Sequence, residues 1–282
     1  MNTYRYNLWK IFEILIKYSI LLIMSFFALL PLFWMVLTSI RSLEEVFSIP
    51  PTPFIKNITW ENYLYVFSDN RFQRYFLNST IVSLSSALIS TLIATLAGYG
   101  FSRFKFKNKE RLFLSVIFCQ MIPLTVIIMP LYYIMEQYKL LDTYFSLILS
   151  YFIITLPFST WMSRAAFTNV PIELEEAAQI DGCDKFRSIL LISMRIAAPA
   201  IAAIFAFCFI EAWNEYVLAM TFINSTSMRT IQIGIMLFRG EFYTDWGKLM
   251  AASTIASIPI IILFIFIQKY FVSGLARGAI KR

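Results

Sequence analysis

The chain has 282 residues, of which 59% are hydrophobic and 15% are charged. Soluble globular domains carry about 25% charged residues, so this composition excludes an ordinary water-soluble domain and a disordered chain. The formal net charge is +7, but the basic residues lie in short clusters between long apolar runs. That pattern is typical of the charged loops of a membrane protein, and it argues against a nucleic-acid-binding domain.

The residues needed for most enzyme chemistry are missing. The chain has no histidine, which excludes His-based metal sites and Ser-His-Asp triads. Its three cysteines have no CxxC spacing, and neither a GxxxxGK[ST] loop nor a GxGxxG motif is present. We therefore expect no catalytic residue, no metal site and no cofactor in this chain.

Six apolar runs predict the membrane spans. A bilayer core needs about 20 apolar residues of helix. Five runs without Asp, Glu, Lys or Arg reach that length, at residues 18–40, 75–102, 112–135, 143–163 and 249–268. A sixth, at residues 196–210, continues past Glu211 and Glu215 to residue 223, and we interpret it as a full span. The fold class predicted is all-α integral membrane, with six transmembrane helices.

The distribution of Lys and Arg predicts the topology. If the N-terminus is cytoplasmic, the cytoplasmic segments hold 16 of these residues and the external loops hold 8. The compact basic cluster at residues 103–111 contributes most to this bias. Residues 1–17 then form a cytoplasmic N-terminus and residues 271–282 a cytoplasmic tail, in a multi-pass protein of the plasma or inner membrane.

The cytoplasmic loop at residues 169–192 has the signals of a helix, a sharp turn and a second helix. Pro171 suits a first helical turn, and the three glutamates that follow it suit the positive end of a helix dipole. Gly182 can end that helix in the left-handed conformation, and Asp184 can cap the next one. Such a helix, with its two alanines, could enter a groove on another protein. A plain amphipathic surface loop explains the same residues equally well.

Several motifs resemble those of a known family. Glu176-Ala177-Ala178, Asp181-Gly182 and Pro199 look like the EAA motif of binding-protein-dependent ABC importer permeases, and more narrowly of the MalG-like carbohydrate permeases. Further resembling segments follow in order at residues 77–80, 98–103, 121–123, 130–132, 213–216, 244–247, 250–252, 268–272 and 274–281. One position departs from the family pattern, because Arg195 stands where a proline is usual, so the start of the fifth span is expected to be less kinked.

The resemblance implies a type I ABC importer permease fold, with a five-helix core at residues 74–270. It implies that the loop at 169–192 couples to a separate ATPase subunit. The residues implied in that coupling are Glu176, Ala177, Ala178, Asp181 and Gly182.

The resemblance also implies the function and the partners. The chain would translocate a sugar or oligosaccharide by alternating access. It would pair with a second, non-identical permease in the membrane lipid, with two ATPase subunits that bind ATP and Mg²⁺, and with an extracytoplasmic solute-binding protein. A glycerol phosphate ester is an alternative solute, and a stand-alone secondary transporter or a membrane-embedded enzyme is an alternative class.

The end of the fifth span is a candidate for the substrate pathway. Ionisable groups within a span usually face a cavity, and aromatic rings stack on sugars, so Trp213, Asn214 and Glu215 are candidates. Glu211 and Glu215 are four residues apart and would share one helix face. The alternative is that these residues lie at the external water interface without a special role.

Overall fold

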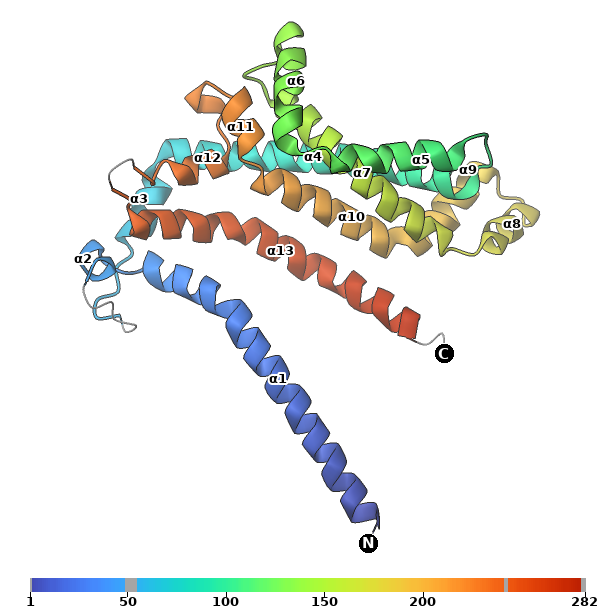
Figure 1. Cartoon of the computed structure of the whole chain (residues 1–282), viewed down its shortest axis with the longest axis horizontal. Helices are drawn as coiled ribbons and strands as arrows, with labels where there is room; N and C mark the ends of the chain where they lie inside the picture. The colour runs from blue at the N-terminus through green and yellow to red at the C-terminus, as the bar shows by residue number, and fades with distance from the viewer. Residues whose placement is uncertain (1, 49–54, 241–242, 280–282) are drawn as a thin grey trace. The chain divides into compact units, whose positions relative to one another are not determined.

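The computed structural model describes residues 2–48, 55–240 and 243–279, so residue 1 of the predicted N-terminus and residues 280–282 of the predicted tail lie outside the described residues. The described chain is mostly helical, with connecting turns and loops, and its described β contacts are two isolated bridge pairs (Figure 1). It forms two compact units, Met1–Asp69 with Ile235–Ile255, and Asn70–Gly234 with Ala256–Arg282. The domain boundaries predicted above stay a prediction.

The helices follow one another with short connections. They are α1 (Asn2–Ser39), α2 (Leu43–Val46), α3 (Glu61–Ser68), α4 (Asn70–Arg103), α5 (Lys109–Phe118), η1 (Cys119–Met121), α6 (Leu124–Gln137), α7 (Tyr144–Thr168), α8 (Ile172–Ile180), α9 (Lys185–Ser188), η2 (Ile189–Ser193), α10 (Met194–Asn214), α11 (Val217–Phe222), η3 (Thr226–Met228), α12 (Ile231–Met236) and α13 (Trp246–Ala279).

The predicted membrane spans are found, with one of them broken. Five described helices are long and apolar enough to cross a membrane: Phe12–Ser39, Asn70–Arg103, Tyr144–Thr168, Lys185–Asn214 and Trp246–Lys269. A bent pair, Lys109–Met121 and Leu124–Gln137, completes the predicted six when it is counted as one span. The all-helical fold class is therefore confirmed.

The third span is not the continuous helix that the sequence predicted for residues 112–135. Its two halves meet at an angle of 99°. Pro123 lies at the break, where it has no N–H to continue the helix and its ring disfavours a helical residue before it. Ile122 is accordingly extended, with φ −75° and ψ 121°.

The fifth span also differs from the prediction, because it does not run to residue 223. The helix ends at Asn214, and Glu215 is extended with φ −69° and ψ 127°. The Glu215 carboxylate instead accepts hydrogen bonds from the backbone N–H groups of Leu218 (2.7 Å) and Ala219 (3.1 Å). It thus caps the separate helix α11. Glu211 and Glu215 therefore do not share one helix face.

In the first unit, α3 is fastened to the end of α1. The Asn62 amide donates to the carbonyls of Ser39 (2.9 Å) and Arg41 (3.0 Å), and the Ser39 and Tyr63 hydroxyls are 2.7 Å apart. The start of α13 packs against the same point, since a Cβ on Gly247 would stand 2.7 Å from the Asn62 side chain. The bond to Ser39 satisfies the last carbonyl of α1, which no later turn of that helix can satisfy.

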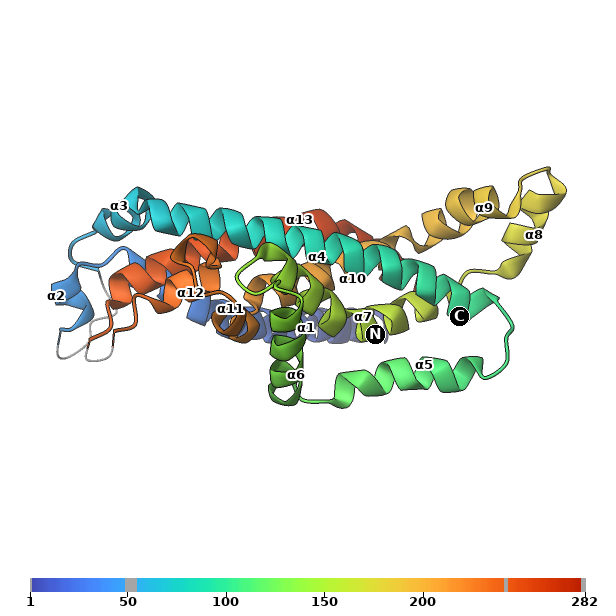
Figure 2. The ribbon, with the colours of Figure 1, turned by 90° about the horizontal axis from the view of Figure 1, so that it is seen from above.

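The second unit is built around α4, α7 and α10. Figures 1 and 2 show these helices side by side, and α10 packs against both of the others. Small hydroxyl side chains fill the contact, and some of them pair across it. The Ser90 and Thr155 hydroxyls are 2.9 Å apart between α4 and α7, and the Ser159 hydroxyl is 3.0 Å from Cys208 Sγ between α7 and α10. Small residues let helix backbones approach closely inside a membrane.

A buried amide holds the connection after α11 against α4. Asn78 is 2% exposed, and its amide donates to the carbonyls of Ser227 (2.9 Å) and Arg229 (2.8 Å). Its oxygen accepts from the Tyr144 hydroxyl at 2.7 Å. All of its hydrogen-bonding groups are therefore used, which fixes this connection to two spans at once.

We expect Asn78→Leu to loosen this connection. The change leaves two carbonyls and the half-buried Tyr144 hydroxyl without their partner, at a cost of about 1–3 kcal/mol for each group that water cannot reach. Limited proteolysis should then cut residues 223–231 faster than in the parent protein. Leu77→Ala is the control, because the Leu77 side chain is 60% exposed. Equal cleavage of the Asn78 variant and the parent would contradict the anchoring role.

Candidate functional site

The loop at residues 169–192 folds into the predicted helix, turn and second helix. Helix α8 begins after Pro171, and it ends where Gly182 takes φ +94°. The N–H of Cys183 reaches the Ala178 carbonyl (3.0 Å), and the N–H of Gly182 reaches the Gln179 carbonyl (3.1 Å). These two bonds form a Schellman motif, which needs a residue that tolerates the left-handed conformation.

The second helix of the loop is capped as expected. The Asp184 carboxylate accepts from the N–H of Arg187 at 2.8 Å, at the start of α9. From there the chain continues as helix through the π-helix η2 into α10, and it passes Arg195 without a break. We call residues 172–188 the elbow; Figures 1 and 2 show it at the end of the second unit where α4 ends, far from α11.

The elbow presents most of its predicted coupling residues to the outside. Glu176, Ala177, Asp181 and Gly182 are exposed, and Ala178 is half-buried. Next to them, Ile180 is 86% exposed at the tip. Ile172, Leu174 and Phe186 of the same elbow are exposed too, and large apolar side chains exposed together are a feature of protein contact surfaces.

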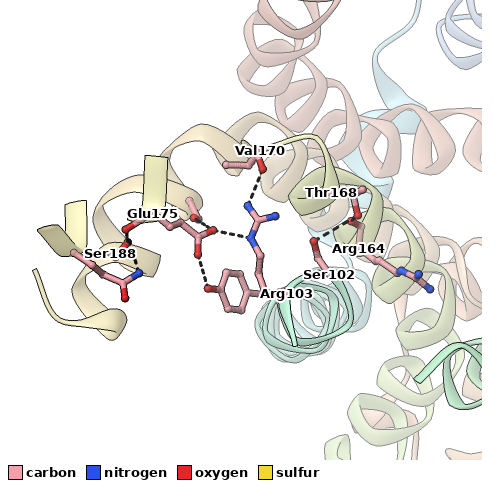
Figure 3. A network of polar contacts seen from close by, with 10 residues as sticks. Ser102, Arg103, Arg164, Thr168, Val170, Glu175 and Ser188 are labelled. Carbon is pink, nitrogen blue, oxygen red and sulfur yellow. Dashed lines mark hydrogen bonds and ion pairs between the residues drawn. The ribbon is translucent and has the colours of Figure 1, made fainter. Parts of the chain in front are cut away.

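The neighbouring glutamate points the other way. Glu175 is 4% exposed, and its carboxylate accepts three hydrogen bonds (Figure 3). The Tyr99 hydroxyl donates at 2.8 Å, the Arg103 guanidinium donates at 2.8 Å, and the Ser193 hydroxyl donates at 2.5 Å. The first two donors lie near the end of α4, and the third lies at the end of η2.

The charge of Glu175 is compensated at this place. Burial by itself favours the neutral acid, but the donors from Ser193, Tyr99 and Arg103 outweigh it and lower the pKa of Glu175 below its ordinary value. The carboxylate is therefore ionised at neutral pH, in a charge-assisted pair with Arg103 that is shielded from water.

The sequence analysis did not single out Glu175 as a site residue. Three glutamates, Glu173, Glu175 and Glu176, lie in the same turn and satisfy the same helix-dipole argument. Which one is buried depends on how α8 is rotated against α4. Arg103 gave a weak signal that a nearby carboxylate is its partner, because it ends α4 and is the first residue of the basic cluster.

The candidates for the substrate pathway lie apart from the elbow and do not form one surface. Trp213 is 1% exposed, its Nε1 donates to the Ala256 carbonyl at 3.1 Å, and its ring stacks on Phe209. Asn214 is exposed, whereas Glu215 is half-buried as the cap of α11. The role of these three residues in the pathway stays a prediction. Within the described ranges, no group of three or more Cys, Asp or Glu side chains could hold a metal ion.

Comparison with known proteins decides the family. Residues 90–277 match the family of the binding-protein-dependent transport system inner membrane component. The chain belongs to this family. It is a multi-pass permease of an ABC importer in the inner membrane, and the resemblance expected from the sequence is confirmed.

Relatives of this permease match it over nearly their whole length. It is 34% identical to the sulfoquinovosyl glycerol transport system permease protein SmoH of Agrobacterium fabrum, over 93% of this chain and 91% of that protein. It is 35% identical to the trehalose/maltose transport system permease protein MalG of Thermococcus litoralis, over 92% and 94%. The fold is similar to a crystal structure of a bacterial ABC transporter involved in the import of the acidic polysaccharide alginate, with a TM-score of 0.78, 22% identity, and coverage of 93% and 97%.

Proposed function

We propose that the permease moves a carbohydrate across the membrane by alternating access, driven by a separate ATPase subunit. The solutes in the names of its relatives support the substrate class: sulfoquinovosyl glycerol, and trehalose or maltose. The structural neighbour takes part in the import of a polysaccharide. Each of these solutes contains a sugar unit.

The observation that most supports coupling to an ATPase is the projecting elbow with its exposed face. The small side chains of Ala177 and Ala178 let another protein approach the backbone of α8 closely. Glu176 offers a carboxylate to a basic residue at the rim of a groove, and Asp181 and Gly182 set the direction of the turn. In this proposal the ATPase holds α8 in a cleft, and its closure pulls on the elbow.

The rest of the assembly follows from this division of work. A second, non-identical permease encloses the pathway, and two ATPase subunits bind ATP and Mg²⁺. An extracytoplasmic binding protein delivers the solute. This chain then binds no cofactor and carries out no chemical step; its spans rock as rigid bodies when the ATPase subunits close and reopen.

The proposal is tested with the Glu176→Lys variant of the complete transporter. Reversing this exposed charge should release the ATPase, so that co-purification in detergent falls by about tenfold or more, as expected for a lost charged contact. Glu173→Lys is the matched control, because Glu173 is also exposed and lies in the same turn. Its co-purification should stay near that of the parent.

Transport is measured in proteoliposomes that contain the complex and its binding protein. The probes are radiolabelled trehalose, maltose, alginate oligosaccharides and glycerol phosphate. ATP-dependent accumulation of a sugar by the parent complex supports the proposal. Uptake without an ATPase, uptake of glycerol phosphate alone, or full ATPase binding by the Glu176 variant would contradict it.

A further inference from the structure

We infer that Glu175 is the positioning residue that transfers the movement of α8 to α4 and α10. The inference deepens the proposed coupling to an ATPase and rests on it. The exposed residues of the elbow would hold the ATPase, whereas the buried carboxylate one residue away would connect the elbow to the spans.

The carboxylate of Glu175 joins two spans that are separate in the sequence. One oxygen accepts from Tyr99, and the other accepts from both Arg103 and Ser193. Tyr99 and Arg103 belong to α4, and Ser193 leads directly into α10. A displacement of α8 along its axis would therefore stretch bonds to both spans at once.

The backbone of α8 is held at the same place. Arg103 Nη2 donates to the Val170 carbonyl just before α8 at 2.8 Å, so one guanidinium holds both the chain before the helix and the Glu175 side chain. The Ser188 hydroxyl donates to the Glu175 carbonyl at 3.1 Å, from the end of α9 (Figure 3). These bonds make the elbow and the ends of the two spans one stiff body.

Apolar packing does not replace this connection. Glu175 is the one residue of α8 whose side chain is buried. The apolar cluster nearby consists of Tyr99, Phe167 and Ala197, and α8 contributes no side chain to it. Hydrogen bonds to a charged group are stronger and more directional than neutral ones, so a joint that depends on them loses its stiffness when the charge is removed.

The test separates transmission of movement from folding and docking. Glu175→Gln keeps the size of the side chain but removes the ion pair with Arg103. We expect ATPase co-purification and ATP hydrolysis close to those of the parent complex, while the number of sugar molecules moved per ATP falls about tenfold. The sugar is the one that the parent complex accumulates from the panel above.

Two partial variants cut the connections one at a time. Tyr99→Phe removes one bond to α4, and Ser193→Ala removes the bond toward α10, so each should lower the ratio of sugar to ATP by less than Glu175→Gln does. Glu110→Gln is the matched control. It breaks a bidentate pair with Arg164 at the same end of the unit, at 2.6 and 2.9 Å, but that pair joins α5 to α7 and does not touch the elbow. Its ratio should not change.

The possible outcomes distinguish the two proposals. A normal ratio of sugar to ATP in Glu175→Gln overturns the role of Glu175 and leaves the ATPase coupling intact. If Glu175→Gln loses both ATPase binding and thermal stability, Glu175 serves only to hold the fold together. This outcome also overturns the inference. A parent complex that binds no ATPase overturns the proposed function itself.

Discussion

Gly98→Ala is expected to destabilise the permease strongly, although it adds only one methyl group. A Cβ at this position would lie 2.2 Å from the Ser163 hydroxyl, 2.4 Å from its Cβ and 2.6 Å from the Arg164 backbone nitrogen. Backbone atoms of α7 cannot move aside without separating the two helices. Overpacking of this kind costs about 1–3 kcal/mol, and more where the neighbour is rigid. The measurement is the temperature at which half of the detergent-solubilised protein loses its monodisperse peak.

Gly100 provides the matched control two residues later in the same helix. A Cβ there meets only the Phe104 ring, at 3.8 Å, which is ordinary contact. Since alanine is about 1 kcal/mol better than glycine inside a helix, Gly100→Ala should leave stability unchanged or raise it. The double variant Gly98→Ala/Ser163→Gly should recover part of the loss, because the Arg164 nitrogen remains close. Equal behaviour of the two alanine variants would contradict the close approach of α4 and α7.

Gly182→Val is expected to abolish stable binding of the ATPase while the spans stay folded. No atom lies within 4 Å of the position that a Cβ would take, so the cost comes from the backbone alone, which has φ +94°. A β-branched residue is a rare outlier there, and the left-handed region costs an L-residue about 1–2 kcal/mol. The turn should therefore open, and α8 should no longer present its exposed face correctly. ATPase co-purification and thermal stability should be measured on the same preparation.

The comparison variant is Gly182→Asn. Asparagine enters the left-handed region more readily than other residues with a side chain, so this variant should retain far more ATPase than the valine variant. If both variants bound the ATPase as the parent does, the left-handed turn would not be required for docking. If both lost it equally, the side chain itself, and not the backbone conformation, would be responsible.

The spans could be predicted because apolar length is a property of the local sequence, but the break in the third span could not. Prolines also lie inside continuous helices of this chain, at Pro31, Pro130, Pro157, Pro199 and Pro259. Among the prolines inside the described membrane-spanning segments, only Pro123 interrupts its helix. Whether a proline breaks a membrane helix depends on whether neighbours satisfy the freed carbonyls, which the local sequence does not contain.

The same distinction applies to the site. Gly182 and Asp184 were predictable because a left-handed turn and a helix cap are decided within a few residues. The burial of Glu175 depends on Tyr99, Arg103 and Ser193, which lie 76, 72 and 18 residues away. Glu215 was misplaced inside a helix for a related reason. Its carboxylate accepts hydrogen bonds from the first N–H groups of α11 and so ends the preceding helix. Counting apolar residues along the sequence does not detect this effect.

The hydroxyl-lined contact of α4 with α7 has a consequence for biogenesis. Each helix satisfies its own backbone hydrogen bonds, so each can be delivered into the bilayer by the insertion machinery before it meets the other. Lipid tails are as apolar as leucine. The association of α4 with α7 therefore gains little free energy from removing apolar side chains from lipid. After insertion, the two helices must diffuse in the bilayer until they meet in the register that places Gly98 against Ser163. A substitution that disrupts the contact of α4 with α7 would give a protein whose helices are inserted with the correct topology but do not assemble into a functional permease.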